Sequence, residues 1–134
     1  MIKYRGGIPP HFSQVKIMGF IYVIENDLNK KKYVGKTTDT LGNRFSKHCW
    51  EAINNPSKNS PLHSAMRKYG IIHFSIRLLE KCEDTLLSER EIYWINKLEL
   101  YSDKSKGYNA TCGGDGNPKY NSEEILALWK QGFN

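Results

Sequence analysis

The sequence predicts an α/β protein of the α+β sandwich class, with helices flanking a small, mostly antiparallel three-stranded sheet. Its 134 residues suit one domain with one core. Apolar residues alternate in some segments and recur at helical spacing in others, in the order strand, strand, helix, helix, strand, helix. We expect the domain to span residues 19–112, after a basic irregular arm (1–18) and before a linker and a last amphipathic segment (113–134).

Three segments have the pattern of strands. Residues 19–26 carry apolar side chains on both faces, which indicates a central strand. Residues 32–35 begin a second strand, and the intervening turn, with Asn29 expected in the left-handed conformation, makes the pair an antiparallel hairpin. Residues 73–80 alternate and form the third strand, with Phe74, Ile76 and Leu78 on its apolar face.

Helical spacing of apolar residues predicts three helices, over residues 40–54, 61–69 and about 85–99. Ser60 is the expected N-cap of the second helix, with Pro61 at its favoured first position and Gly70 at its end. Thr85 is the expected cap of the third helix. A further amphipathic piece begins at Ser122.

The charge is basic and uneven. Twenty Lys and Arg residues against fourteen Asp and Glu give a formal net charge of +6. Most of the excess lies in residues 28–70, where Asp39 and Glu51 are the only acids. Such a balance favours a polyanionic partner, nucleic acid first and an anionic membrane surface second, although a soluble protein can be basic without either partner.

The three cysteines are far apart and include no Cys-x-x-Cys pair, which argues against a disulfide framework and a structural zinc site. They fit a reduced, cytoplasmic setting. The N-terminal residues lack the apolar stretch of a signal peptide. No run of about 20 apolar residues would span a membrane.

Glu91 is the first candidate for chemistry. It lies four residues after Leu87 and four before Ile95, on the apolar stripe of the third helix. An ionised carboxylate there costs several kcal/mol unless a cation, a metal or a donor meets it. The alternatives are a partly exposed glutamate at the edge of the stripe, or a structural ion pair with an arginine.

Other candidates cluster in the first half of the chain. Arg44 and His48 are four residues apart and share a helix face, where they can clamp a phosphate and serve a proton transfer, or form an ordinary basic surface. Tyr22 and Tyr33 stand on neighbouring strands, where sheet packing is the alternative role. Gly35 permits a close approach of backbone.

These residues lie in segments that resemble the motifs of the GIY-YIG nucleases. The five segments follow one another at the spacing of the family: GFIYVIEN, KKYVGKT, RFSKH, SEREIYWI and GYNA. In the first, Phe20, Ile21 and Tyr22 replace the literal Gly-Ile-Tyr, with Gly19 one residue earlier; in the second, valine replaces isoleucine. The resemblance covers roughly residues 19–112.

The resemblance implies a compact nuclease fold that hydrolyses DNA, expected to be double-stranded, with one Mg²⁺ or Mn²⁺ per active site. Glu91 matches the metal-binding glutamate of the family, and Arg44 the arginine that contacts phosphate. His48 matches a histidine near the scissile group. The implied catalytic set is completed by Tyr22, Tyr33 and Asn109, with Tyr22 favoured over Tyr33 as general base and Asn109 in a supporting role.

Substrate contacts are expected from Gly35, Lys36 and Lys47; for Lys36, a solvated position at the strand end is the alternative. His63 follows the first helix later than an active-site histidine of some homing members would, so we expect it on the helix surface. The C-terminal segment resembles the opening of a helix-turn-helix. The resemblance thus implies a homing-type or phage-type endonuclease in a bacterial or phage-infected cell. The alternatives are a repair or restriction nuclease of the same family, and a DNA-binding module without catalysis.

Overall fold

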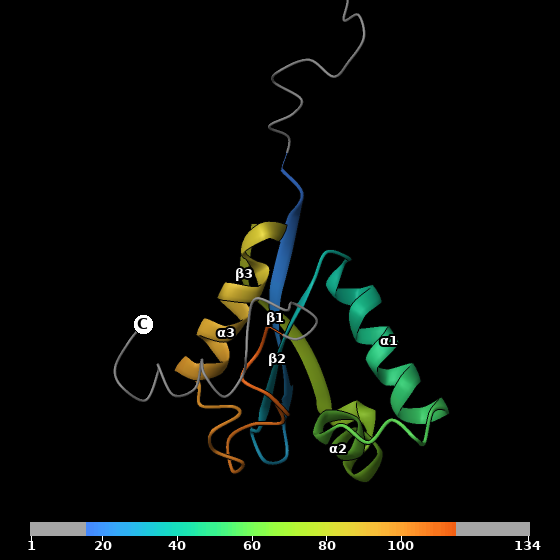
Figure 1. Cartoon of the computed structure of the whole chain (residues 1–134). Helices are drawn as coiled ribbons and strands as arrows, with labels where there is room; N and C mark the ends of the chain where they lie inside the picture. Colours follow the sequence, from blue (N-terminus) through green and yellow to red (C-terminus); the bar gives the residue numbers. More distant parts are fainter. Residues whose placement is uncertain (1–15, 115–134) are drawn as a thin grey trace, which may run out of the picture.

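The computed structural model describes residues 16–114 (Figure 1). The expected arm up to residue 15 and the amphipathic piece at Ser122 lie outside these residues. The elements are β1 (Met18–Asn26), β2 (Lys32–Thr37), α1 (Leu41–Asn54), α2 (Pro61–Tyr69), η1 (Ile71–His73), β3 (Phe74–Glu83), η2 (Asp84–Leu86) and α3 (Leu87–Lys97). None of the helices in the described part is long and apolar enough to cross a membrane.

The predicted fold class is confirmed. The three strands form one antiparallel sheet in the order β2-β1-β3, with β1 in the centre as its two apolar faces indicated. Figure 1 shows α3 on one face of the sheet and α1 and α2 on the other. Successive residues of β1 enter different cores: Tyr22 and Ile24 face α1 and α2, whereas Ile21 and Val23 face α3.

The third strand differs from its prediction in length and register. It runs to Glu83, and Ile21 pairs with Glu80 while the next residue, Tyr22, pairs with Leu78. Leu79 therefore has no partner on β1, as in a β-bulge. The predicted alternation fails at this point, because Leu78 is 49% exposed and Leu79 packs against the α3 core instead.

Two local predictions are wrong. In the β1–β2 turn the left-handed residue is Lys30, with φ of 65°, because the side chain of Asn29 accepts a hydrogen bond from the Lys31 N–H at 3.0 Å. Thr85 does not cap α3: its hydroxyl donates to Glu83 at 3.4 Å, and the N-cap position falls on Leu86, which makes no side-chain cap.

The outer edge of β2 is closed by the loop after α3. Backbone hydrogen bonds join Lys32 to Lys106 (3.1 Å) and to Tyr108 (2.8 Å). The Asn109 amide then takes the place of the next peptide group, because its Oδ1 accepts from the Val34 N–H at 3.0 Å and its Nδ2 donates to the Val34 carbonyl at 2.9 Å. This side chain fixes the loop against the strand that carries Tyr33 and Gly35.

Replacing Asn109 by Asp should destabilise the fold by about 2 kcal/mol, because the Val34 carbonyl loses its donor and a charge is buried beside it. Chemical denaturation measures the change. Asn59→Asp is the matched control: Asn59 is exposed and uses its Oδ1 to accept from Arg67, a role that aspartate retains. Equal midpoints for the two variants would contradict the role assigned to the Asn109 amide.

Candidate active site

The site is built around the hydroxyl of Tyr22, a residue that is 0% exposed. A side chain on Gly35 would collide with this tyrosine, since a Cβ there would lie 2.3 Å from the Tyr22 oxygen. The hydroxyl meets two residues of α1: the Arg44 Nε donates to it at 3.2 Å, and the His48 Nε2 lies 2.8 Å away. The motif glycine thus makes room for the ring that joins the sheet to α1.

Burial sets the protonation states of both Tyr22 and His48. Burial raises the pKa of Tyr22, although Arg44 opposes the shift, so the phenol is protonated at neutral pH. Burial lowers the pKa of His48 to about 3, with help from the charges of Arg44 and His63, so its ring is neutral. Arg44 can only donate, so the Tyr22 oxygen accepts from it, while the tautomer of the neutral His48 ring sets which partner donates in the second hydrogen bond.

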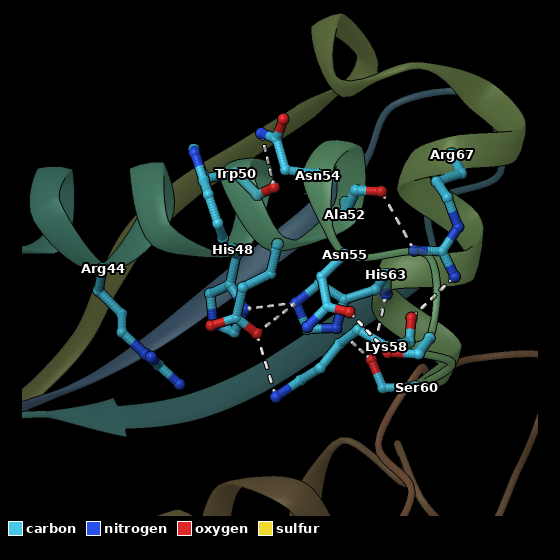
Figure 2. A network of polar contacts seen from close by, with 12 residues as sticks. Arg44, His48, Trp50, Ala52, Asn54, Asn55, Lys58, Ser60, His63 and Arg67 are labelled. Carbon is cyan, nitrogen blue, oxygen red and sulfur yellow. Dashed lines mark hydrogen bonds and ion pairs between the residues drawn. The ribbon is translucent and has the colours of Figure 1, made fainter.

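His63 is not on the helix surface as expected, but is 4% exposed and belongs to the site. Its Nε2 lies 3.2 Å from the Nδ1 of His48. Its Nδ1 is hydrogen-bonded to the Oγ of Ser60, which also accepts from the His63 backbone N–H. Figure 2 shows the two histidine rings facing each other, with Ser60 beside His63. These contacts form one continuous chain of hydrogen bonds from Tyr22 through His48 and His63 to Ser60.

The sequence held a signal for this arrangement. Ser60 is the N-cap of α2 and His63 stands three residues later, where side chains commonly reach back toward the cap. Glu51 was also missed, although it follows Arg44 by seven residues and His48 by three, on one helix face. Its Oε2 lies 3.9 Å from the His63 Nε2 and 3.1 Å from the Lys58 Nζ.

Glu91 is buried, which rules out the partly exposed alternative. It is 7% exposed on α3, between Leu87 and Ile95, which pack into the core of that face. Its Oε1 accepts from the Gly114 N–H at 3.0 Å and lies 3.8 Å from the Lys36 Nζ. Lys36 is half-buried and donates to Ser88 at 2.9 Å, so it is no solvated strand-end lysine.

A cleft of about 310 Å³ joins these groups. Most of the residues singled out in the sequence line it: Tyr33, Arg44, Lys47, His48, Glu91 and Asn109. Tyr22 lies beneath it, Gly35 packs on Tyr22, and Lys36 reaches Glu91 from β2. The structure thus brings the nine residues to one place, together with Glu51, Lys58, Ser60 and His63.

Glu91 is suited to hold a hard divalent cation, because a carboxylate that lines a cleft offers the oxygen ligands such ions prefer. Within residues 16–114 no group of three or more His, Cys, Asp and Glu side chains could hold a metal ion. In that part of the chain at most one other such side chain could join Glu91 at a metal, so water and substrate oxygens would supply most of the remaining ligands.

The family profile of the GIY-YIG catalytic domain matches residues 18–109. The chain belongs to the GIY-YIG family. The match includes the strands that carry Tyr22 and Tyr33, the helix of Arg44 and His48, the helix of Glu91, and Asn109. GIY-YIG nucleases generally use a divalent metal, which agrees with the character of the Glu91 position.

Two viral proteins are similar to this chain in sequence. Intron-associated endonuclease 1 of Enterobacteria phage T4 is 33% identical over 111 residues, which are 79% of this chain and 43% of that protein. The MSV199 domain-containing protein 146R of Invertebrate iridescent virus 6 is 43% identical over 65 residues, or 48% of this chain and 26% of that protein. The chain thus spans less than half the length of either relative.

Solved GIY-YIG structures agree with the fold. A structure of the catalytic domain of intron endonuclease I-TevI superposes with a TM-score of 0.63 at 30% identity, covering 74% of this chain and 99% of that one. A second structure, of the catalytic domain of the homing endonuclease I-TevI, superposes with a TM-score of 0.57 at 32% identity. The match covers 68% of this chain and 96% of that one.

The ring of His48 should remain neutral well below pH 6, which NMR of its ring nitrogens measures. Because its pKa in the folded protein, about 3, is below the usual 6.5, the unfolded chain binds the proton first. Stability should therefore fall as the pH drops from 6.5 toward 3, by up to about 1.4 kcal/mol per pH unit from this residue. His48→Gln, as the control, should lose that part of the dependence. Titration of the ring near pH 6.5 would contradict the assignment.

Proposed function

We propose that this chain is a DNA endonuclease that hydrolyses phosphodiester bonds in double-stranded DNA, with one Mg²⁺ or Mn²⁺ per active site. The observation that supports this most directly is the convergence of Tyr33, Arg44, His48 and Glu91 on one cleft. A guanidinium can stabilise charge on a phosphate, an imidazole and a phenol can serve proton transfer, and a carboxylate can hold a metal, so these groups together suit phosphodiester hydrolysis. Similarity to the phage T4 protein supports a homing-type or phage-type enzyme.

Arg44 would hold the scissile phosphate. Its Nε is engaged by Tyr22, which fixes the plane of the guanidinium and leaves its terminal amino groups for the two non-bridging phosphate oxygens. Lys47 follows one turn later on the cleft side of α1 and adds a second cation. Together they would neutralise charge that grows on the phosphate as the attacking oxygen approaches.

For the attacking water, the burial of Tyr22 matters. The resemblance favoured Tyr22 as general base, but its hydroxyl is enclosed and already hydrogen-bonded to Arg44 and His48. Tyr33 lines the cleft itself, with its ring 5.6 Å from that of His48. We therefore assign to Tyr33, acting as its phenolate, the acceptance of the proton from water, and to Tyr22 the positioning of Arg44 and His48.

Glu91 would be the protein ligand of the metal. A bound divalent ion would stabilise negative charge on the phosphate oxygens during hydrolysis. The Gly114 N–H donates to the carboxylate and the Lys36 ammonium lies 3.8 Å from it, and both contacts favour a negative charge there. Asn109 would support the site by fixing β2, as described above.

Glu91→Gln should lower the rate of plasmid nicking with magnesium by at least about 100-fold, because the amide cannot replace the charged ligand. The matched control is Glu89→Gln, an exposed glutamate on the same helix, which should retain the wild-type rate. Nicking that persists in Glu91→Gln would remove this residue from the site. DNA binding without any cleavage by the wild type would favour the inactive binding module.

The two tyrosines should respond differently to loss of the hydroxyl. Tyr33→Phe should reduce the rate about 100-fold, since its role is proton transfer, with a smaller loss of stability than Tyr22→Phe because Tyr33 lies at the cleft surface. Tyr22→Phe should lower stability as well, by about 1–3 kcal/mol, because Arg44 and His48 both lose a buried partner. The pH–rate profile and the denaturation midpoint separate the effects. A wild-type rate in Tyr33→Phe would return the proton-acceptor role to Tyr22.

A further inference from the structure

Next to the catalytic cleft lies a second hollow of about 320 Å³, which we call the lysine groove. Three lysines from distant parts of the sequence line it: Lys31 in the β1–β2 turn, Lys68 on α2 and Lys104 in the loop after α3. Pro61 and Tyr108 belong to the walls of both hollows, so the groove adjoins the cleft directly.

The groove is uniformly cationic. Within residues 16–114, no Asp or Glu lines it, and none of its three ammonium groups forms an ion pair with a carboxylate. Other lysines of the same region are paired, such as Lys32 with Glu25 and Lys58 with Glu51. Three positive charges that lie close together repel one another and so oppose folding. An anionic ligand bound among them would relieve this repulsion.

Aromatic rings hold the three lysines in place without neutralising them. The Nζ of Lys31 lies 5.5 Å from the centre of the Tyr108 ring, that of Lys68 5.1 Å from Tyr69, and that of Lys104 4.6 Å from Tyr101. The Lys104 Nζ also donates to the Asn109 carbonyl at 3.5 Å, in the segment that walls the cleft. A cation–π contact orients an ammonium group and leaves its charge available to a ligand.

The chemistry of the groove fits a phosphodiester backbone. Its cations are point charges on three separate elements, an arrangement that suits a chain of successive phosphates better than one small anion. Its contact with the cleft matters equally, because a DNA strand whose scissile phosphate lies at Arg44 must continue past the cleft on either side. The phosphates next to the scissile one then meet cations only where a basic groove adjoins the cleft.

We propose that the lysine groove binds the DNA phosphates adjacent to the scissile one, on one side of the cut. This rests on the proposed endonuclease function and deepens it, because the groove fixes the direction in which the cleaved strand leaves the cleft. Binding here is independent of sequence, since ammonium groups on phosphates read no bases.

Lys68→Gln/Lys104→Gln in the full chain tests the proposal by DNA binding, measured over a range of salt concentrations without divalent metal. The slope of log affinity against log salt should become about 1.8 shallower, for two lost phosphate contacts. Lys81→Gln/Lys97→Gln is the matched control: it removes the same charge from β3 and α3, outside the groove, and should leave the slope unchanged.

Neutral methylphosphonate linkages, placed one at a time around the cut site, locate the contact. A linkage that weakens binding of the wild type but not of Lys68→Gln/Lys104→Gln identifies the phosphate held by the groove, because the two losses are not additive. An unchanged salt slope, or additive losses at every flanking position, would overturn the proposal. If the wild type nicks plasmid DNA but the salt slope and the linkage scan do not change as expected, only the role of the lysine groove is refuted. If the wild type binds DNA through the groove but does not nick it, only the endonuclease function is refuted.

Discussion

The enclosed hydroxyl of Tyr22 is the point on which the site depends. It connects the central strand to Arg44 and His48, two of the α1 residues that line the cleft, and through His48 to His63 and the cap of α2. Its ring needs the space that Gly35 leaves on the neighbouring strand. Two strands and two helices are therefore aligned by one phenol, next to a His48 ring that stays neutral because its own burial and the Arg44 charge lower its pKa.

The parts of the fold that depend on periodicity were predictable. The apolar faces of residues 19–26 placed β1 in the centre, and the capping chemistry of Ser60 and Pro61 placed the start of α2. Predictions failed where a single contact overrides the pattern. At Leu79 the register shifts, and in the turn the Asn29 side chain moves the left-handed position to Lys30. Such events depend on neighbours that one segment of sequence does not reveal.

The candidate site also contains residues that the sequence pattern reveals and residues that it does not. Glu91 could be found because an acid on an apolar stripe contradicts the pattern around it. His63 and Glu51 could not be found with the same ease, since each has an ordinary explanation on its own helix, and their meaning lies in the approach of α2 to α1. Charge alone indicated a polyanionic partner, but only the folded chain shows which lysines gather beside the cleft.

The amide of Asn109 closes the outer edge of β2 by imitating a peptide group. An edge strand with open donors and acceptors can recruit a strand from another molecule, which is a common route to self-association. Here that route is blocked along the wall of the cleft that must stay accessible to substrate. The side chain that completes the wall therefore also keeps the sheet from growing at that edge, so access for a ligand does not expose the molecule to aggregation there.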